Sequence, residues 1–267
     1  MVYAMTYHHV VSLGSSFASG PGIEPLVDKV AGRSGRNYPS LLAVGLGAVL
    51  TDRTASGATL ANIVDTPQRV GLKKLRPQLD NAPRDADLVT ITAGGNDLGY
   101  SINMIRIALA NRLRTSGLGR PLAGLLRPKA LPAVSEQQRT DMAEGLARVI
   151  GSIREQMPAA RIVVVDYLTV LNSQSVNTAN APFTPDELTA LNGVATILSE
   201  VLEETSQKMG VDFVASRAIS TDHAVGAPEP WVVGMPAKIR GIASRPPFHP
   251  NEVGMKAIAA HLQEVLA

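Results

Sequence analysis

DLVTIT at residues 87–92, followed by AGGND at residues 93–97, is the stretch that decides the fold. Its first part is a short run of apolar and β-branched residues, which is typical of a strand buried on both faces. The Gly94-Gly95 pair then ends the strand in a turn. Strands buried on both faces belong to parallel sheets with helices on either side, so this stretch predicts an α/β protein.

Similar apolar runs recur before and after this stretch. HVVSL at residues 9–13 and RIVVVD at residues 161–166 are rich in valine and predict two further buried strands, with two shorter strands besides. The predicted strands are residues 9–13, 48–51, 87–92, 161–166 and 211–214.

Helical patterns separate these runs. Ser135 and Thr184 are typical helix caps, and Gly210 is a typical end signal. The predicted helices are residues 38–46, 135–157, 184–209 and 251–266. The alternation of strands and helices predicts a three-layer α/β/α sandwich with a central parallel sheet.

The chain has 267 residues, of which 45% are hydrophobic, so it can bury one sizeable core. We therefore expect a single domain over residues 1–267. Two segments, residues 101–134 and 215–247, do not fit the alternation and are expected to be insertions, which often form lids or binding loops. The apolar stretch at residues 102–126 either lines an acyl groove or packs as an extra helix pair.

Composition excludes several classes of function. The net charge is only +2 and no basic patch is interleaved with aromatic residues, which argues against binding to nucleic acid. The chain has no cysteine, so disulfides, thiolate metal sites and cysteine nucleophiles are excluded. No two histidines have a metal-ligand spacing, and the loop at residues 14–22 lacks the lysine of a phosphate-binding loop. We expect neither a metal nor another cofactor.

No apolar run is long enough to cross a membrane, and no signal peptide is visible at residues 1–11. The sequence therefore predicts a soluble protein without stable membrane insertion. It is either cytoplasmic or secreted after removal of a signal peptide. The oligomeric state is left open.

Polar residues follow the predicted strands at the edge where parallel α/β sheets bind ligands. GSSFASG at 14–20 and GGND at 94–97 each follow a strand, SGAT at 56–59 lies between them, and His249 precedes the last helix. A serine hydroxyl, an imidazole, an amide and glycine N–H groups would meet there. These groups are the parts of an acyl-transfer site, because a serine nucleophile needs a base and its intermediate needs donors for an oxyanion.

These stretches, in this order over residues 10–255, resemble the sequence blocks of SGNH (GDSL-like) hydrolases. The resemblance makes Ser16 the nucleophile and His249, in FHP at 248–250, its general base. It makes the Ser16 N–H, the Gly57 N–H and the Asn96 amide the oxyanion donors. It also implies a flavodoxin-like arrangement of the sandwich. The activity it implies is hydrolysis of a carboxylic ester through an acyl-enzyme intermediate.

The sequence departs from the family pattern at two positions. Ser15 stands where the family has an aspartate before the nucleophile, and Pro246 stands where it has the aspartate of the triad. That acid orients the imidazole through its Nδ1–H. We therefore expect a Ser16–His249 dyad in which the backbone carbonyl of Pro246 orients the ring, with Asp222 as the alternative acid. PWVVG at 230–234 also resembles an actinobacterial-type branch of the family.

Other functions stay open at this point. A non-catalytic ligand-binding protein on the same fold would explain the altered blocks, and a deacetylase of acetylated carbohydrate would use the same chemistry. An α/β-hydrolase is disfavoured because the serine lies at position 16 and Ala18 replaces a glycine of its nucleophile motif. The apolar residues 102–126 favour lipid-like or medium-chain esters as substrates.

Overall fold

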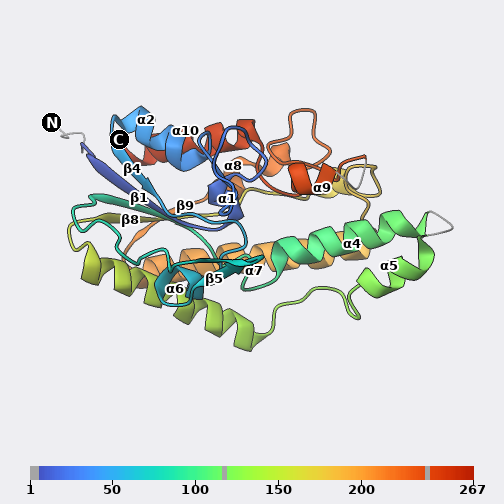
Figure 1. Cartoon of the computed structure of the whole chain (residues 1–267). Coiled ribbons are helices and arrows are strands. Elements are labelled where there is room, and N and C mark those ends of the chain that lie inside the picture. Colours follow the sequence, from blue (N-terminus) through green and yellow to red (C-terminus); the bar gives the residue numbers. More distant parts are fainter. Residues whose placement is uncertain (1–5, 116–118, 238–240) are drawn as a thin grey trace.

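The computed structural model describes residues 6–115, 119–237 and 241–267. At its centre five parallel strands form one sheet in the order β4-β1-β7-β8-β9 (Figure 1). In chain order this is the 2-1-3-4-5 arrangement of flavodoxin-like proteins, so the predicted fold class is confirmed. The strands are β1 (His9–Gly14), β4 (Val49–Asp52), β7 (Leu88–Thr92), β8 (Arg161–Val165) and β9 (Asp212–Val214).

The pairing of β1 with β7 sets the position of the polar loops. All five residues of β7 are buried, as expected for a strand covered on both faces. The register runs from Val10 opposite Leu88 to Gly14 opposite Thr92. The two strands therefore end side by side, and the loops that follow them start at the same edge of the sheet. This is the point where the order of the strands reverses, which is where such sheets bind ligands.

Helices cover both faces of the sheet (Figure 1). On one face α2 (Tyr38–Leu46) packs against α10 (Glu252–Leu266). On the other, α6 (Glu136–Gln156) packs between α3 (Leu60–Val64) and α7 (Pro185–Met209). These layers make the predicted α/β/α sandwich.

The long helices begin and end at the predicted signals. The Ser135 side chain accepts a hydrogen bond from Gln138 N at the start of α6, and Thr184 does the same for α7. Gly210 ends α7 in a left-handed conformation that costs glycine little. Hydrogen bonds at the caps therefore fix where α6 and α7 begin, and a glycine fixes where α7 ends.

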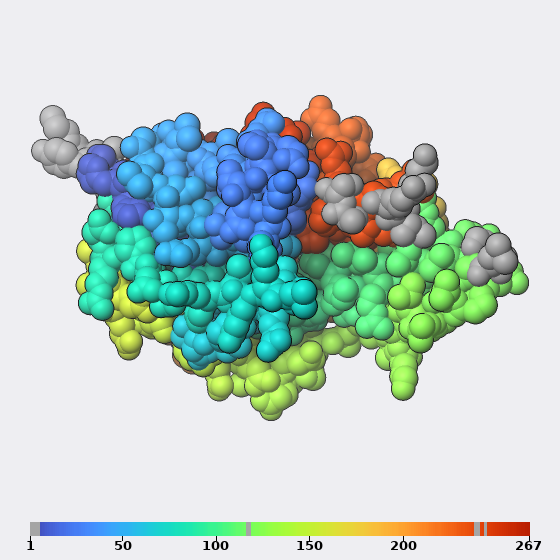
Figure 2. Space-filling model, viewed as in Figure 1, coloured from blue at the N-terminus to red at the C-terminus, as the bar shows by residue number. Residues whose placement is uncertain are grey.

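The first insertion is a helix pair. It contains α4 (Tyr100–Arg114), which packs against α7, and α5 (Arg120–Leu126), which folds back along α4. The pair forms one end of the molecule (Figures 1 and 2). The apolar stretch at residues 102–126, of which 116–118 lie outside the described residues, forms this extra helix pair; its role in lining an acyl groove stays a prediction.

The part of the second insertion that the structure describes has little regular structure. It holds the short helices α8 (Ser216–Ile219), η2 (Thr221–His223) and α9 (Gly241–Ser244). The remaining elements lie outside the sheet and are short: α1 (Ser16–Ser19), η1 (Ser173–Ser175) and the hairpins β2 (Leu26–Asp28) with β3 (Arg33–Ser34) and β5 (Gln68–Val70) with β6 (Lys73–Leu75). No helix among the described residues is both long and apolar enough to span a membrane.

Candidate active site

The backbone around Gly14 fixes the place of Ser16. Gly14 has a φ of 139°, and a Cβ there would lie 2.2 Å from the carbonyl oxygen of Thr92, so only glycine fits. Ser15 N donates to the same carbonyl at 2.9 Å. The chain then enters α1 at Ser16, which is buried with 3% of its surface exposed.

Gln78 holds the other side of this turn. Its Nε2 donates to the Gly14 carbonyl at 2.9 Å, and its Oε1 accepts from the Gly14 N–H at 2.7 Å. Gln78 is itself tied to α3, since its N–H donates to the carbonyl of Asn62 at 3.1 Å. The end of β1 is therefore bonded on both sides. Sequence reasoning missed Gln78, which lies in an irregular stretch without a motif.

His249 reaches Ser16 directly. Its Nε2 lies 2.9 Å from the Ser16 Oγ, although 233 positions separate the two residues. Burial lowers the pKa of His249 below its ordinary value, which favours the neutral ring that can accept a proton. The Phe17 ring lies beside the imidazole, with 5.4 Å between the ring centroids.

The carbonyl that orients His249 belongs to Pro247, and our prediction of Pro246 is wrong by one residue. His249 Nδ1 lies 2.8 Å from the Pro247 oxygen. The cause is Phe248, whose φ of 62° turns the chain sharply between the carbonyl and the ring. A carbonyl can only accept, so Nδ1 carries the hydrogen and Nε2 is free to accept from Ser16.

Loop contacts hold this turn in place. Phe248 N donates to the Val233 carbonyl at 2.6 Å, and Val233 N donates to the His249 carbonyl at 2.8 Å. The Phe248 ring packs on Phe183 at a centroid distance of 5.3 Å. The segment at 230–234 thus acts as a support for the histidine.

The structure contradicts Asp222 as the alternative acid. Asp222 lies exposed in η2, and no hydrogen bond to His249 is present among the described residues. Its neighbour His223 stacks on Trp231 at 3.9 Å between centroids and accepts a backbone hydrogen bond from it. This loop therefore anchors Trp231 and does not reach the imidazole.

The three candidate oxyanion donors have N–H groups available. Asn96 Nδ2 donates one hydrogen to the Ala58 carbonyl at 2.8 Å, which joins Asn96 to the loop of Gly57. Its second hydrogen has no partner among the described residues. The backbone N–H groups of Ser16 and Gly57 bond to no other residue that the structure describes. Ala55 N donates to the Gly14 carbonyl at 3.0 Å, so the loop of Gly57 lies beside the serine turn.

Tyr167 is a site residue that sequence reasoning missed. Its hydroxyl lies 3.2 Å from Ser15 Oγ and accepts from Gly95 N at 3.0 Å, and its ring packs on Phe17 at 4.6 Å. Burial raises the pKa of this hydroxyl well above its ordinary value, so it stays protonated. It links the serine turn to the loop of Asn96. Its only sequence signal is its place just after the RIVVVD strand.

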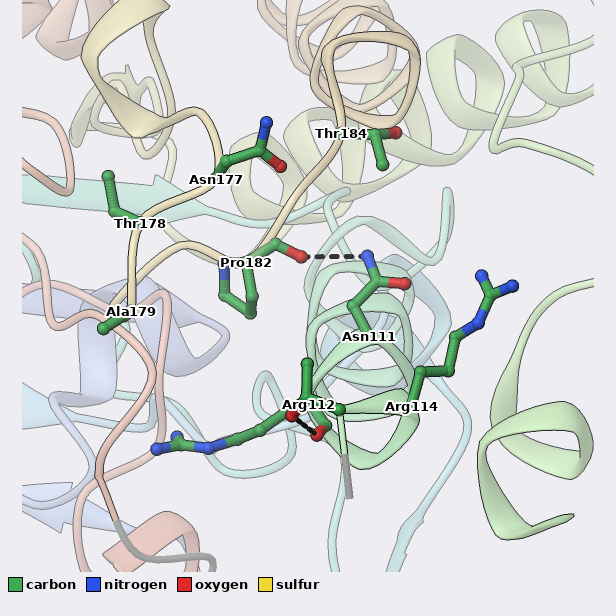
Figure 3. A pocket seen from close by; sticks show the side chains of 9 residues that line it. Asn111, Arg112, Arg114, Asn177, Thr178, Ala179, Pro182 and Thr184 are labelled. Atoms are coloured by element: carbon green, nitrogen blue, oxygen red, sulfur yellow. Dashed lines mark hydrogen bonds between the residues drawn. The ribbon is translucent and has the colours of Figure 1, made fainter. Parts of the chain in front are cut away.

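A pocket of about 520 Å³ lies away from these residues, between the end of α4 and the loop at 177–184 (Figure 3). Neither Ser16 nor His249 lines it. Within residues 6–115, 119–237 and 241–267, no group of three or more His, Asp or Glu side chains could hold a metal ion.

Known proteins resemble this chain in both sequence and fold. The sequence profile of the GDSL-like lipase/acylhydrolase family matches residues 12–257. Lipase 2 of Streptomyces coelicolor is 27% identical, over 96% of this chain and 85% of that protein.

Two solved structures share the fold at 22% identity. Phospholipase A1 from Streptomyces albidoflavus has a TM-score of 0.72, with 97% of this chain and 99% of that chain covered. An extracellular lipase from Streptomyces rimosus has a TM-score of 0.69, with 96% and 99% covered.

Proposed function

Because the chain belongs to the GDSL-like lipase/acylhydrolase family, we propose that it hydrolyses carboxylic esters with Ser16 and His249 as its catalytic dyad. The observation that carries the assignment of residues is the 2.9 Å contact between Ser16 Oγ and His249 Nε2. A nucleophile within hydrogen-bond reach of its base, and a base oriented by a third group, is the arrangement that serine catalysis requires.

The first half of the reaction forms an acyl-enzyme. Neutral His249 takes the Ser16 proton as Oγ attacks the carbonyl carbon of the ester. The Ser16 N–H, the Gly57 N–H and the second hydrogen of Asn96 Nδ2 donate to the oxyanion of the tetrahedral intermediate. When the intermediate collapses, His249 gives its proton to the departing alcohol, and Ser16 keeps the acyl group.

The second half releases the acid. His249 takes a proton from water, which attacks the acyl carbon, and the same three donors hold the second oxyanion. Collapse of this intermediate breaks the bond to Ser16 Oγ, and His249 returns the proton to it. Throughout the reaction, the Pro247 carbonyl accepts a hydrogen bond from His249 Nδ1 and so keeps the hydrogen on that nitrogen, as the carboxylate of a triad would. Unlike a carboxylate, the carbonyl places no full negative charge beside the imidazolium.

For the substrate we propose lipid-like or medium-chain esters. Similarity to proteins named lipase and phospholipase A1 supports this class, and so does the apolar surface of the helix pair, where Ile102, Leu122 and Leu125 are exposed. A deacetylase of acetylated carbohydrate is the alternative, and a chain-length series distinguishes the two. A series of p-nitrophenyl esters should give the highest kcat/KM at medium chain length, whereas a deacetylase prefers acetate.

The series is best run on the wild type, Ser16→Ala and His249→Ala. Activity that survives Ser16→Ala would overturn the mechanism. Labelling with a serine-directed fluorophosphonate separates an enzyme from a non-catalytic binding protein. The wild type should be labelled at Ser16, and a binding protein without an activated serine should stay unlabelled.

A further inference from the structure

Positive charge is concentrated in the first insertion. Residues 98–135 contain six arginine and lysine residues and no aspartate or glutamate. The net charge of the whole chain is only +2, so the remainder of the molecule is net acidic. The basic residues are Arg106, Arg112, Arg114, Arg120, Arg127 and Lys129.

Half of these cations are used within the fold. Arg127 forms an ion pair with the buried Glu187 at 3.0 Å, and Arg106 Nε donates to the Leu126 carbonyl at 3.3 Å. Arg112 donates to the carbonyls of Pro236 and Ala237. These contacts attach α4 and α5 to each other and to the rest of the molecule.

The other three cations face solvent. Arg114, Arg120 and Lys129 are exposed, and none forms an ion pair with a residue that the structure describes. Cations without acidic neighbours are available to an anionic partner, and their interactions add up when they lie on one surface.

An exposed apolar face lies on α5. Only Ala123 of α5 is buried, while Leu122 is 56% and Leu125 is 78% exposed. With 100° between successive residues, both leucines and the exposed Pro121 lie on the arc opposite Ala123. An apolar face on a helix that carries basic residues elsewhere on its surface is typical of helices that lie in the interface of a membrane.

Arg114 lines two hollows at this end of the molecule. The first is the 520 Å³ pocket in Figure 3, where Arg112 and Arg114 leave α4 in different directions. The second has a volume of about 450 Å³ and lies between Arg114, Arg120 and Arg127. Guanidinium groups bind phosphate oxygens through two parallel hydrogen bonds, so a hollow lined by the exposed Arg114 and Arg120 suits a phosphate group.

We propose that the α4–α5 pair docks the protein on the surface of an anionic phospholipid layer. Leu122 and Leu125 enter the interfacial region, and Arg114, Arg120 and Lys129 contact lipid phosphates. α4 connects this surface to the loop of Asn96, because the helix begins four residues after Asn96 and ends at Arg114. The binding itself needs no catalysis, so the proposal rests on the proposed function only for the lipid-like substrate that docking would supply.

Co-sedimentation with vesicles tests the docking. The protein used is the Ser16→Ala variant, so that no lipid is hydrolysed, and the vesicles are phosphatidylcholine with or without phosphatidylglycerol. We expect binding to the anionic vesicles only. The triple variant Arg114→Gln, Arg120→Gln, Lys129→Gln should bind about 100-fold more weakly, a factor of about five for each basic residue at the surface.

A matched control removes the same charge elsewhere. Arg69→Gln, Lys73→Gln, Lys74→Gln changes three exposed residues of the β5–β6 hairpin and lowers the net charge equally. It should keep the binding, and equal losses in the two triple variants would overturn the proposal. Leu122→Ser, Leu125→Ser should also weaken binding, while Val44→Ser, whose side chain is 81% exposed on α2, should not.

The outcomes keep the two proposals separate. Ester hydrolysis without vesicle binding refutes the docking and leaves the dyad intact. Vesicle binding by a protein that neither hydrolyses esters nor reacts with the fluorophosphonate refutes the dyad and leaves the docking intact. If Leu122 and Leu125 support self-association in the absence of vesicles, as sedimentation velocity would show, the face pairs two copies and the lipid proposal is wrong.

Discussion

The serine turn (residues 14–20) and the histidine turn (residues 246–251) meet at one hydrogen bond but are held by different means. The serine turn is bonded to Thr92 of β7 and to Gln78, and glycine occupies its left-handed position at Gly14. The histidine turn is bonded to Val233 in an irregular loop, and its left-handed position is Phe248.

The difference shows how the site divides its tasks. Strand pairing gives the nucleophile a fixed place, because a sheet has few alternative registers once both faces are buried. Loop packing gives the imidazole its orientation, and it uses a backbone conformation that costs a bulky residue about 1–3 kcal/mol. The histidine turn is therefore the part of the site that depends on its surroundings.

The largest expected effect is the loss of either member of the dyad. Ser16→Ala and His249→Ala should each lower kcat by about 10⁴- to 10⁶-fold, and the double variant should be no worse, because the two residues act as a unit. Steady-state kinetics on one p-nitrophenyl ester would measure all three. A double variant much slower than either single one would show that the two turns work independently.

The second largest effect is expected at the oxyanion donors, whose loops are bonded to the serine turn and, among the described residues, not to the histidine turn. Asn96→Ala should lower kcat about 100- to 1000-fold with little change in KM, because the lost donor acts mainly in the transition state. A decrease in kcat of less than about tenfold would show that Asn96 is not an oxyanion donor. Thermal unfolding of the variant checks that the loop of Gly57, to which Asn96 is bonded, stays folded.

Tyr167→Phe tests the link between the serine turn and the loop of Asn96. It removes the hydroxyl that bonds Ser15 and Gly95. We expect kcat to fall about tenfold, which corresponds to the free energy of one buried hydrogen bond. Tyr100→Phe is the matched control. Tyr100 is equally buried and lies edge-on to Tyr167, with 6.5 Å between the ring centroids. A similar loss in both variants would mean that Tyr167 acts only through packing.

The pH profile reports on the burial of the histidine turn. His249 must be neutral to accept a proton, so kcat/KM falls only when the pH drops below its pKa. Since burial lowers that pKa, the acid limb should lie below pH ~6.5, and the loss from pH ~7.5 to ~5.5 should be smaller than the ~tenfold of an ordinary histidine. An acid limb above pH ~6.5 would require an anion near the ring and would contradict a carbonyl orienter.

The smallest effect is expected at Asp222. Because Asp222 is exposed and the Pro247 carbonyl already bonds Nδ1, Asp222→Asn should change kcat less than about twofold and leave the acid limb in place. A loss of several orders of magnitude in a folded variant would refute the dyad. The same measurement on Asp186→Asn, an exposed carboxylate at the start of α7, gives the background for removing one surface charge.

Patterns of local chemistry account for what the sequence predicts well. Runs of valine and isoleucine define the central strands, and Ser135, Thr184 and Gly210 define the helix ends. The two hairpins were not predicted, because strands such as KKL at 73–75 are too short and too polar to stand out. The assignment of the whole chain to one domain stays a prediction.

The missed parts of the site depend on torsions and distant contacts. Spacing placed the orienting carbonyl three residues before His249, but the left-handed Phe248 moves it to Pro247, and a spacing does not encode a single φ. Tyr167 and Gln78 lie 152 and 64 positions from their partners in the serine turn. Nothing next to them in the sequence identifies those partners.

The amide of Gln78 has a consequence for how such proteins diversify. The pairing of β4 with β1 ends at Asp52. Beyond that point the side chain of Gln78 accepts from the N–H of Gly14 and donates to its carbonyl, as the backbone of a neighbouring strand would. The segment of residues 55–78 is bonded to Gly14 at both of its ends, by Ala55 N and by the Gln78 amide. The β5–β6 hairpin inside this segment can therefore change in length and sequence while the nucleophile keeps its position.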